Sequence, residues 1–195
     1  MKKLIIILAI LSFFDGANAQ AWVKEKEKEG ITVYSKTSSQ YRMKASKAEM
    51  VVSASVDKVV NTVFDVKSYL IWMPDCAKIE ILKTISSNEI IYYGLHSTPW
   101  PAASRDLVIN LKKVPIDGGY KVIMTNKSNY IEVKEDAVRV PIYFGEWKII
   151  KTTAGTRVSI EYQTDPGGSV PDWMIQGAAT KTPFDLFEAM KKKML

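Results

Sequence analysis

The last part of the sequence constrains the fold most, because it has the pattern of one long terminal helix. A cluster of turn-forming residues, 165–168, is followed by a helix-forming segment from Trp173 to Met194. Ser169 is placed as an N-cap, and Asp172 three residues later completes a capping-box pattern. At 1.5 Å per residue such a helix spans roughly 36 Å, more than packing in a small domain requires. We therefore expect the rest of the chain to wrap around it.

The two halves of this predicted helix differ in polarity. The first half, residues 173–179, is apolar on nearly every side, whereas the second half carries charged residues such as Lys181 and Asp185. This pattern predicts an enclosed first half and a second half on the surface. Pro183 has no amide hydrogen to donate to the carbonyl of Ala179, so a bend is expected near the middle.

The first 19 residues have the features of a secretory signal peptide. Lys2 and Lys3 precede an apolar run, residues 4–14, and three small residues, 17–19, follow it. The run is shorter than the ~20 residues that span a membrane, so cleavage before Gln20 is expected rather than retention as an anchor. The protein is then exported, to the periplasm if its source has two membranes. Residues 20–195 are expected to form one domain.

Composition narrows the classes of function. Cys76 is the only cysteine, so the expected oxidising compartment is not used for an internal disulfide. The net charge of +6 is spread along the chain, without the basic and aromatic stripe that nucleic-acid binding requires. This mild positive charge favours transient contact with anionic lipid headgroups. We expect a monomer that does not bind nucleic acid.

The middle of the chain has the alternation of an antiparallel sheet built from successive hairpins. The candidate strands cover residues 31–35, 42–52, 77–85, 89–96, 106–113, 120–125, 137–141, 143–151 and 156–164. A helix capped by Ser55 is expected to close near Val66, and residues 22–29 have the pattern of a short solvent-facing helix ended by Gly30. Alternation predicts one apolar and one wet face. The fold class is therefore α+β, with a curved antiparallel sheet that grips the terminal helix.

A stiff loop at residues 98–106 adds the most specific motif. Trp100 stands between two prolines, and Arg105 and Asp106 re-enter the sheet with opposite charges. This motif, followed by residues 165–168 and by residues 171–173 before the last helix, resembles the StAR-related lipid transfer (START) domain family. The resemblance covers residues 21–195 and has two separate motifs in the expected order.

The resemblance implies a helix-grip fold with a tunnel between sheet and C-terminal helix that holds one lipid or sterol. It also implies that the Trp100 loop and the start of the last helix form the mouth. Sterol-binding members face their ligand with a buried acid and base, whose positions fall here near Tyr92 and at Leu111. Neither residue is charged, so sterol recognition by such a pair is not expected.

The candidate ligand-binding residues share a predicted place on the tunnel wall or at its mouth. They are Tyr92, Trp100, Arg105, Leu107, Ile109, Leu111, Tyr162, Trp173, Gly177 and Ala178.

Each of these has a plainer alternative. Gly177 and Ala178 either leave volume for a ligand or allow close packing of helix on sheet, and the tyrosines either meet a headgroup or fill the core. Arg105 is either a cation for a phosphate or, as we favour, the structural partner of a nearby carboxylate. Trp100 is either a membrane-inserting or gating tip, or a folded-back lid.

Catalytic signals are few. His96 and Cys76 are the only residues of their types, and neither nucleophile-elbow nor paired-histidine motifs occur. No metal site and no cofactor is expected. The leading interpretation is non-enzymatic binding or transfer of a hydrophobic ligand such as a phospholipid or acyl chain. The alternatives are a cyclase- or hydrolase-like enzyme acting on an apolar substrate in the same cavity, and a cargo-free scaffold that binds through the Trp100 loop.

The N-terminal pattern and the single thiol give one direct prediction. The exported protein starts at Gln20, and Cys76 remains a thiol without an intramolecular partner. Intact mass measurement under non-reducing conditions checks both points. A mass that retains residues 1–19, or a linked dimer abolished by Cys76→Ser, would contradict them.

Overall fold

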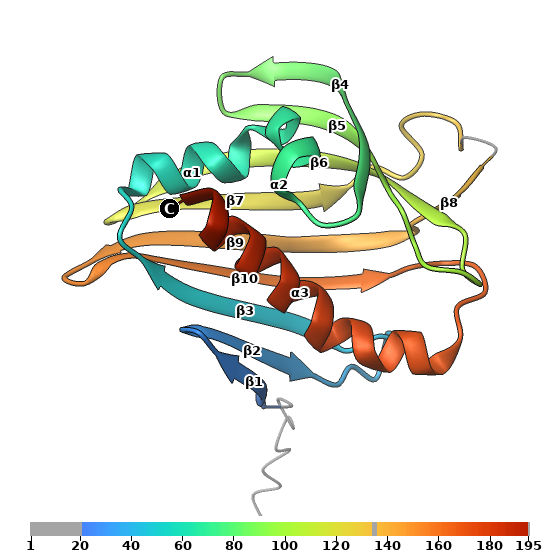
Figure 1. Cartoon of the computed structure of the whole chain (residues 1–195). Helices are drawn as coiled ribbons and strands as arrows, with labels where there is room; N and C mark the ends of the chain where they lie inside the picture. Colours follow the sequence, from blue (N-terminus) through green and yellow to red (C-terminus); the bar gives the residue numbers. More distant parts are fainter. Residues whose placement is uncertain (1–20, 134–135, 195) are drawn as a thin grey trace, which may run out of the picture.

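The chain folds as a single curved sheet with its helices on one side. The structure, a computed structural model, describes residues 21–133 and 136–194. Within them, ten strands form one sheet in the order β1-β2-β3-β10-β9-β7-β6-β5-β4, with β8 paired to β6. All neighbouring pairs are antiparallel except β6–β8. Figure 1 shows α1, α2 and α3 on the same side of this sheet. The predicted α+β helix-grip arrangement is confirmed.

The element bounds follow the predicted strands closely from residue 76 onward. The strands are β1 Val23–Lys28, β2 Ile31–Lys36, β3 Ala45–Val52, β4 Cys76–Ser86, β5 Glu89–His96, β6 Ser104–Ile116, β7 Gly119–Asn126, β8 Ala137–Arg139, β9 Ile142–Thr152 and β10 Gly155–Asp165. The helices are α1 Val56–Phe64, a 3-10 turn Val66–Ser68, α2 Tyr69–Trp72 and α3 Asp172–Met194.

The predicted first helix is wrong, because residues 23–28 form the edge strand β1. The Lys-Glu alternation has a period of two, which suits a strand with one face in water. Glu29 and Gly30 both have positive φ, 54° and 77°, and make the tight turn into β2. The strand is held partly by Lys26, whose ammonium lies 3.3 Å from the ring centroid of Phe184 on α3.

The burial of α3 is the reverse of the prediction. Its second half packs Phe184, Phe187 and Met190 into the core, and the Phe187 ring stacks on Trp147 of β9 at 5.7 Å. In the first half, Trp173 is 68% exposed. The prediction failed because the first half, although apolar, contains small residues that bury little area. The large apolar residues of the second half form one continuous stripe beneath its charges.

The start of α3 also differs from the prediction. The helix begins at Asp172, so Ser169 lies too far upstream to cap it. Arg42 instead fixes this end, with its guanidinium donating to the Val170 carbonyl at 3.0 Å and to the Asp172 carboxylate at 2.5 Å. A distant basic residue thus replaces the local cap that the sequence indicated.

Pro183 lies inside α3 and leaves the carbonyl of Ala179 without its helical donor, as predicted. The hydroxyl of Ser46, buried on β3, donates to that carbonyl at 2.9 Å. Figure 1 shows that the first turns of α3 run in a different direction from the rest. The freed carbonyl therefore becomes the point where helix and sheet are joined.

The outer face of the sheet is not wet throughout. Ile91, Tyr93 and Val108 form a second, smaller core there, and Ile131 packs against it. Asp106, fully buried beside this core, accepts two hydrogen bonds from Arg139, at 2.8 and 3.0 Å. Simple alternation did not predict this cover, because it comes from a connection distant in sequence.

The joint between Ser46 and Ala179 yields a stability prediction. Ser46→Ala leaves a buried carbonyl without a donor and should lower the free energy of unfolding by about 1–3 kcal/mol. Pro183→Ala restores a helical amide donor for the same carbonyl, so Ser46→Ala should cost less in that background. Chemical denaturation of the four proteins measures the coupling. Equal losses in both backgrounds would mean that the hydrogen bond is not what Ser46 supplies.

Candidate functional site

Four tyrosines form a row on the inner side of the sheet, in the region faced by α2 and α3. We call them the phenol row: Tyr69 on α2, Tyr92 on β5, Tyr143 on β9 and Tyr162 on β10. The rings of Tyr69 and Tyr92 meet edge to face at 6.2 Å, and those of Tyr143 and Tyr162 stack at 5.8 Å. Tyr143 links the two pairs, since it lies close enough to Tyr92 and Tyr69 for electrostatic effects between them.

Burial dominates the acid–base behaviour of the phenol row. It raises the pKa of Tyr69, Tyr92 and Tyr143, and it raises the pKa of Tyr162 to about 12. Desolvation is the largest cause in each case, because an ionised phenol loses its hydration inside the domain. All four hydroxyls are therefore neutral near neutral pH.

The hydroxyls are unevenly supplied with partners. Tyr69 donates to the Val63 carbonyl. Tyr162 hydrogen-bonds Ser46, so it extends the joint between β3 and α3. Tyr143 reaches only the sulfur of Met124, at 3.8 Å. For Tyr92 no described residue supplies a hydrogen-bond partner.

Tyr143 and Tyr162 also report on internal space. Both lie deep enough for burial to raise their pKa, yet both keep more accessible surface than packed neighbours such as Trp147 and Ile160. Both side chains therefore border accessible space, which for Tyr162 includes the open depression that it lines with Met124. Such packing gaps along an apolar wall are a property of ligand sites.

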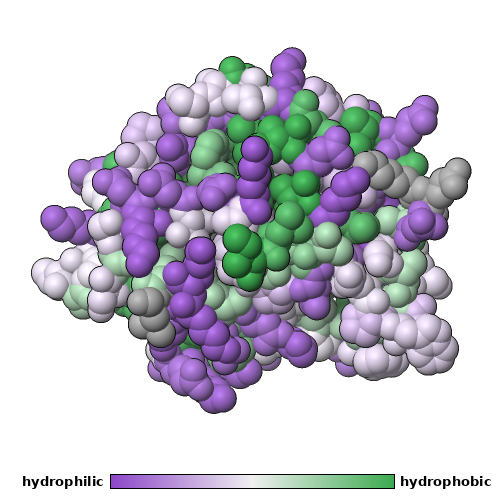
Figure 2. Space-filling view, turned by 45° about the horizontal axis from the view of Figure 1, so that its top comes forward, coloured by the Kyte–Doolittle hydropathy of each residue, from purple (hydrophilic) through white to green (hydrophobic). Residues whose placement is uncertain are grey.

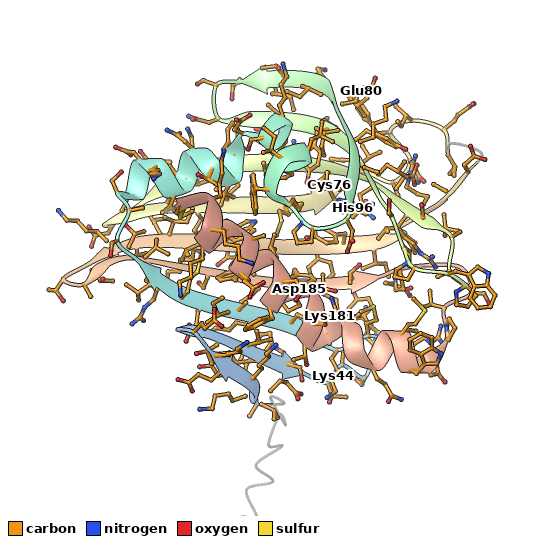
Figure 3. All side chains as sticks on the ribbon, in the orientation of Figure 1. Lys44, Cys76, Glu80, His96, Lys181 and Asp185 are labelled. Carbon is orange, nitrogen blue, oxygen red and sulfur yellow. The ribbon has the colours of Figure 1, made fainter. Side chains whose placement is uncertain are left out.

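Cys76 and His96 stand opposite each other on β4 and β5, on the same inner side. Figure 3 labels both close together above α3, where Lys181 and Asp185 project from the helix. Burial lowers the pKa of His96 while Asp75 opposes that shift, and burial raises the pKa of Cys76. Both groups are therefore neutral near neutral pH, and they add a thiol and an imidazole to the wall.

Arg105 is buried, with 6% of its surface exposed, and serves as a structural cation. Its guanidinium donates to the carbonyls of Ala103, Pro166 at 3.2 Å and Gly167 at 3.0 Å. It thereby ties the base of the Trp100 loop to the turn before α3. The expected pairing with Asp106 is wrong, because adjacent strand residues point to opposite faces and Asp106 meets Arg139 instead.

The end of the domain near this tie is exposed and aromatic. Trp100 at the loop tip is 89% exposed, and Trp173 belongs to the exposed first turns of α3. A separate apolar group lies on α2, where Leu70 and Ile71 are exposed. Figure 2 shows green side chains gathered near the centre of the face that carries α2, ringed by purple.

The structure separates the predicted site residues into three groups. Inward-facing residues of the sheet comprise Tyr92, Leu107, Ile109, Leu111 and Tyr162. Arg105, Trp100 and Trp173 lie toward the predicted mouth. Gly177 is exposed with open space around its Cα, and Ala178 is half-buried, so in this conformation neither lies in an enclosed part of α3.

Sequence reasoning missed two members of the phenol row. Tyr143 shares the inward phase of Trp147 and Ile149 in its strand, so alternation alone would have found it. Tyr69 lies between the helix expected to close near Val66 and the strand expected from residue 77, in a segment for which no element was predicted. Its position follows from the short helix α2.

Depressions of the described surface are open rather than enclosed. One of them, of about 440 Å³, is open and is lined by outer-face residues such as Trp22, Lys36 and Phe144, and it also reaches Met124 and Tyr162. No group of three or more potential metal ligands occurs among residues 21–133 and 136–194. In the same described part of the chain, no helix is long and apolar enough to cross a membrane.

Comparison with known proteins places this geometry in context. The model of the START domain family matches residues 15–194. A STAR-related lipid transfer protein of Xanthomonas axonopodis is 29% identical with a TM-score of 0.82, over 89% of this chain and 98% of that one. An uncharacterised protein of Pseudomonas aeruginosa is 26% identical over 98% of this chain and 95% of its own length.

More distant structures share the fold. Human StAR-related lipid transfer protein 5 has a TM-score of 0.77 at 17% identity, covering 93% of this chain and 88% of its own. The Zhui aromatase/cyclase of a Streptomyces species has a TM-score of 0.55 at 14% identity, covering 78% of this chain and 94% of its own. The fold is thus shared by proteins named as lipid transfer proteins and by a protein named as an aromatase/cyclase.

The placement of the small residues of α3 gives a paired prediction. Gly177→Leu should raise the free energy of unfolding by about 0.5–1 kcal/mol, because leucine favours a helix more than glycine and meets no neighbour. Ala179→Leu should lower it by about 1–3 kcal/mol, because Ala179 is buried against the sheet. Denaturant titration of both variants checks this, and a large loss in Gly177→Leu would place that side of the helix in a packed interface.

Proposed function

Because the chain belongs to the START domain family, we propose that it is a non-enzymatic protein that binds or transfers a lipid between the inner face of the sheet and α3. The phospholipid, acyl chain or similar ligand would lie along Ile109, Leu111 and the phenol row. The similarity to a bacterial lipid transfer protein at 29% identity supports this class of cargo.

The observation that carries the proposal is the accessible surface that Tyr143 and Tyr162 keep on the inner face of the sheet. Well-packed interiors leave few gaps larger than a water molecule. Space beside apolar walls therefore calls for an occupant or for rearrangement. Shielding an acyl chain is worth on the order of 0.8 kcal/mol per methylene, so a dozen methylenes supply roughly 10 kcal/mol before ordering costs.

Entry would pass between the Trp100 loop and the first turns of α3. Few contacts hold those turns beyond the Arg42 hydrogen bonds and the buried residues Ile175 and Ala179. Exposed indoles prefer the boundary between water and lipid, so Trp100 and Trp173 suit transient contact with a membrane surface. We propose that an exported monomer makes this contact.

An enzymatic alternative would use His96 as its acid or base. The shared fold of an aromatase/cyclase keeps this alternative open but carries no residue roles at 14% identity. Within the described chain no carboxylate hydrogen-bonds His96 to orient it, and Cys76 opposite has its pKa raised rather than lowered. Both features argue against Cys76 and His96 acting as a nucleophile and its general base.

The test is native mass spectrometry of gently purified protein, followed by lipid extraction. We expect copurifying lipid, and we expect Trp100→Ala to slow exchange of a fluorescent lipid with little loss of thermal stability. Protein that is repeatedly empty and takes up no lipid would favour a scaffold. Turnover of an apolar ester panel that disappears in His96→Ala would favour the enzyme.

A further inference from the structure

The polar ends of three tyrosines and one cysteine converge within the proposed lipid site. The rings of Tyr69 and Tyr92 meet edge to face at 6.2 Å, Cys76 lies close enough to influence the electrostatics of Tyr92, and Tyr92 influences those of Tyr143. The groups come from α2, β4, β5 and β9, so four elements of the fold direct them to one place. Apolar residues such as Ile109 and Met124 surround them.

This group has hydrogen-bonding capacity that the described protein leaves unused. The Tyr92 side chain is about nine-tenths buried and finds no partner among the described residues. Tyr143 has only a thioether sulfur, which is a weak acceptor. Tyr69 uses its hydrogen on the Val63 carbonyl but keeps its oxygen as an acceptor. The Tyr92 hydroxyl is not among the fully buried side-chain atoms of the described residues that lack a partner, so it keeps some accessible surface. One unpaired donor, one donor held only by a sulfur, and one acceptor, all beside accessible space, point to a ligand oxygen.

The site has no charge to offer an anion. The guanidinium of Arg105 donates hydrogen bonds to three backbone carbonyls of the protein. Burial lowers the pKa of His96, so this side chain is neutral at ordinary pH. Lys181 pairs with Asp185 on the exposed side of α3. A carboxylate or phosphate placed among the phenols would lose its hydration without gaining a counter-ion, which is strongly unfavourable.

We infer that Tyr92 and Tyr143, with Tyr69, form the recognition point for an uncharged lipid oxygen, such as a hydroxyl or carbonyl, and that the site discriminates against acidic lipids of equal length. This inference rests on the proposed lipid-binding function. It assigns the specificity to hydroxyl groups that phenylalanine would remove without changing the packing.

The test compares three probes of equal chain length, dodecane, 1-dodecanol and laurate, with delipidated protein at a mildly alkaline pH where laurate is ionised. We expect dodecanol to bind tightest. The double variant Tyr92→Phe/Tyr143→Phe should weaken dodecanol about tenfold, as two neutral hydrogen bonds are lost, and leave dodecane unchanged. Tyr34→Phe is the matched control, because its hydroxyl serves Glu49 on the outer face.

The outcomes separate the two levels of the proposal. Tighter binding of laurate than of dodecanol, or equal weakening of dodecanol and dodecane in the double variant, overturns the inference and leaves lipid binding intact. Binding of none of the probes by protein that also carries no lipid on purification overturns the proposed function itself. Unchanged dodecane binding in the double variant also shows that it has folded.

Discussion

The hydrogen bond from Ser46 to the carbonyl of Ala179 determines how the helix meets the sheet. A proline inside a helix leaves one carbonyl without a donor, and a buried carbonyl must find another partner. Here that partner sits on β3, and Tyr162 extends the same chain of hydrogen bonds from β10. The defect that bends α3 is therefore the point that holds it, with the aromatic stack of Phe187 on one side and the phenol row on the other.

This joint divides α3 into parts with different roles. Beyond it, Phe184, Phe187 and Met190 pack as an ordinary core. Before it, the helix carries small residues, an exposed tryptophan and an end fixed by Arg42. Parts of a protein with few buried contacts open most easily, so motion is expected where the sequence places small side chains. The small residues in the first half of α3 therefore matter mainly because they leave this part of the helix with few buried contacts.

Much of the architecture could be predicted from local pattern, and most errors concern long-range partners. Period-two alternation predicted the strands after residue 76, and the pattern of the terminal segment predicted its helix. The charges of β1 misled because alternating lysine and glutamate suit either a helix surface or an edge strand. Asp106 was assigned to Arg105 because they are neighbours, whereas its partner Arg139 lies 33 residues away. Tyr69 was missed because α2 is a single turn whose position depends on the sheet beneath it.

The second core behind β5 and β6 gives the two walls of the site unequal stiffness. Ile91, Tyr93 and Val108 close one side of these strands while Ile109 and Leu111 close the other, so their backbone is protected from water on both faces. At the other end of the sheet, β1 presents charged residues to solvent along the edge. The wall formed by β5 and β6 is therefore the stiffer side of the site. Amide hydrogens on β5 and β6 are therefore expected to exchange among the slowest in the fold, and any change in the width of the site is expected to come from less enclosed elements, β1 and the first turns of α3.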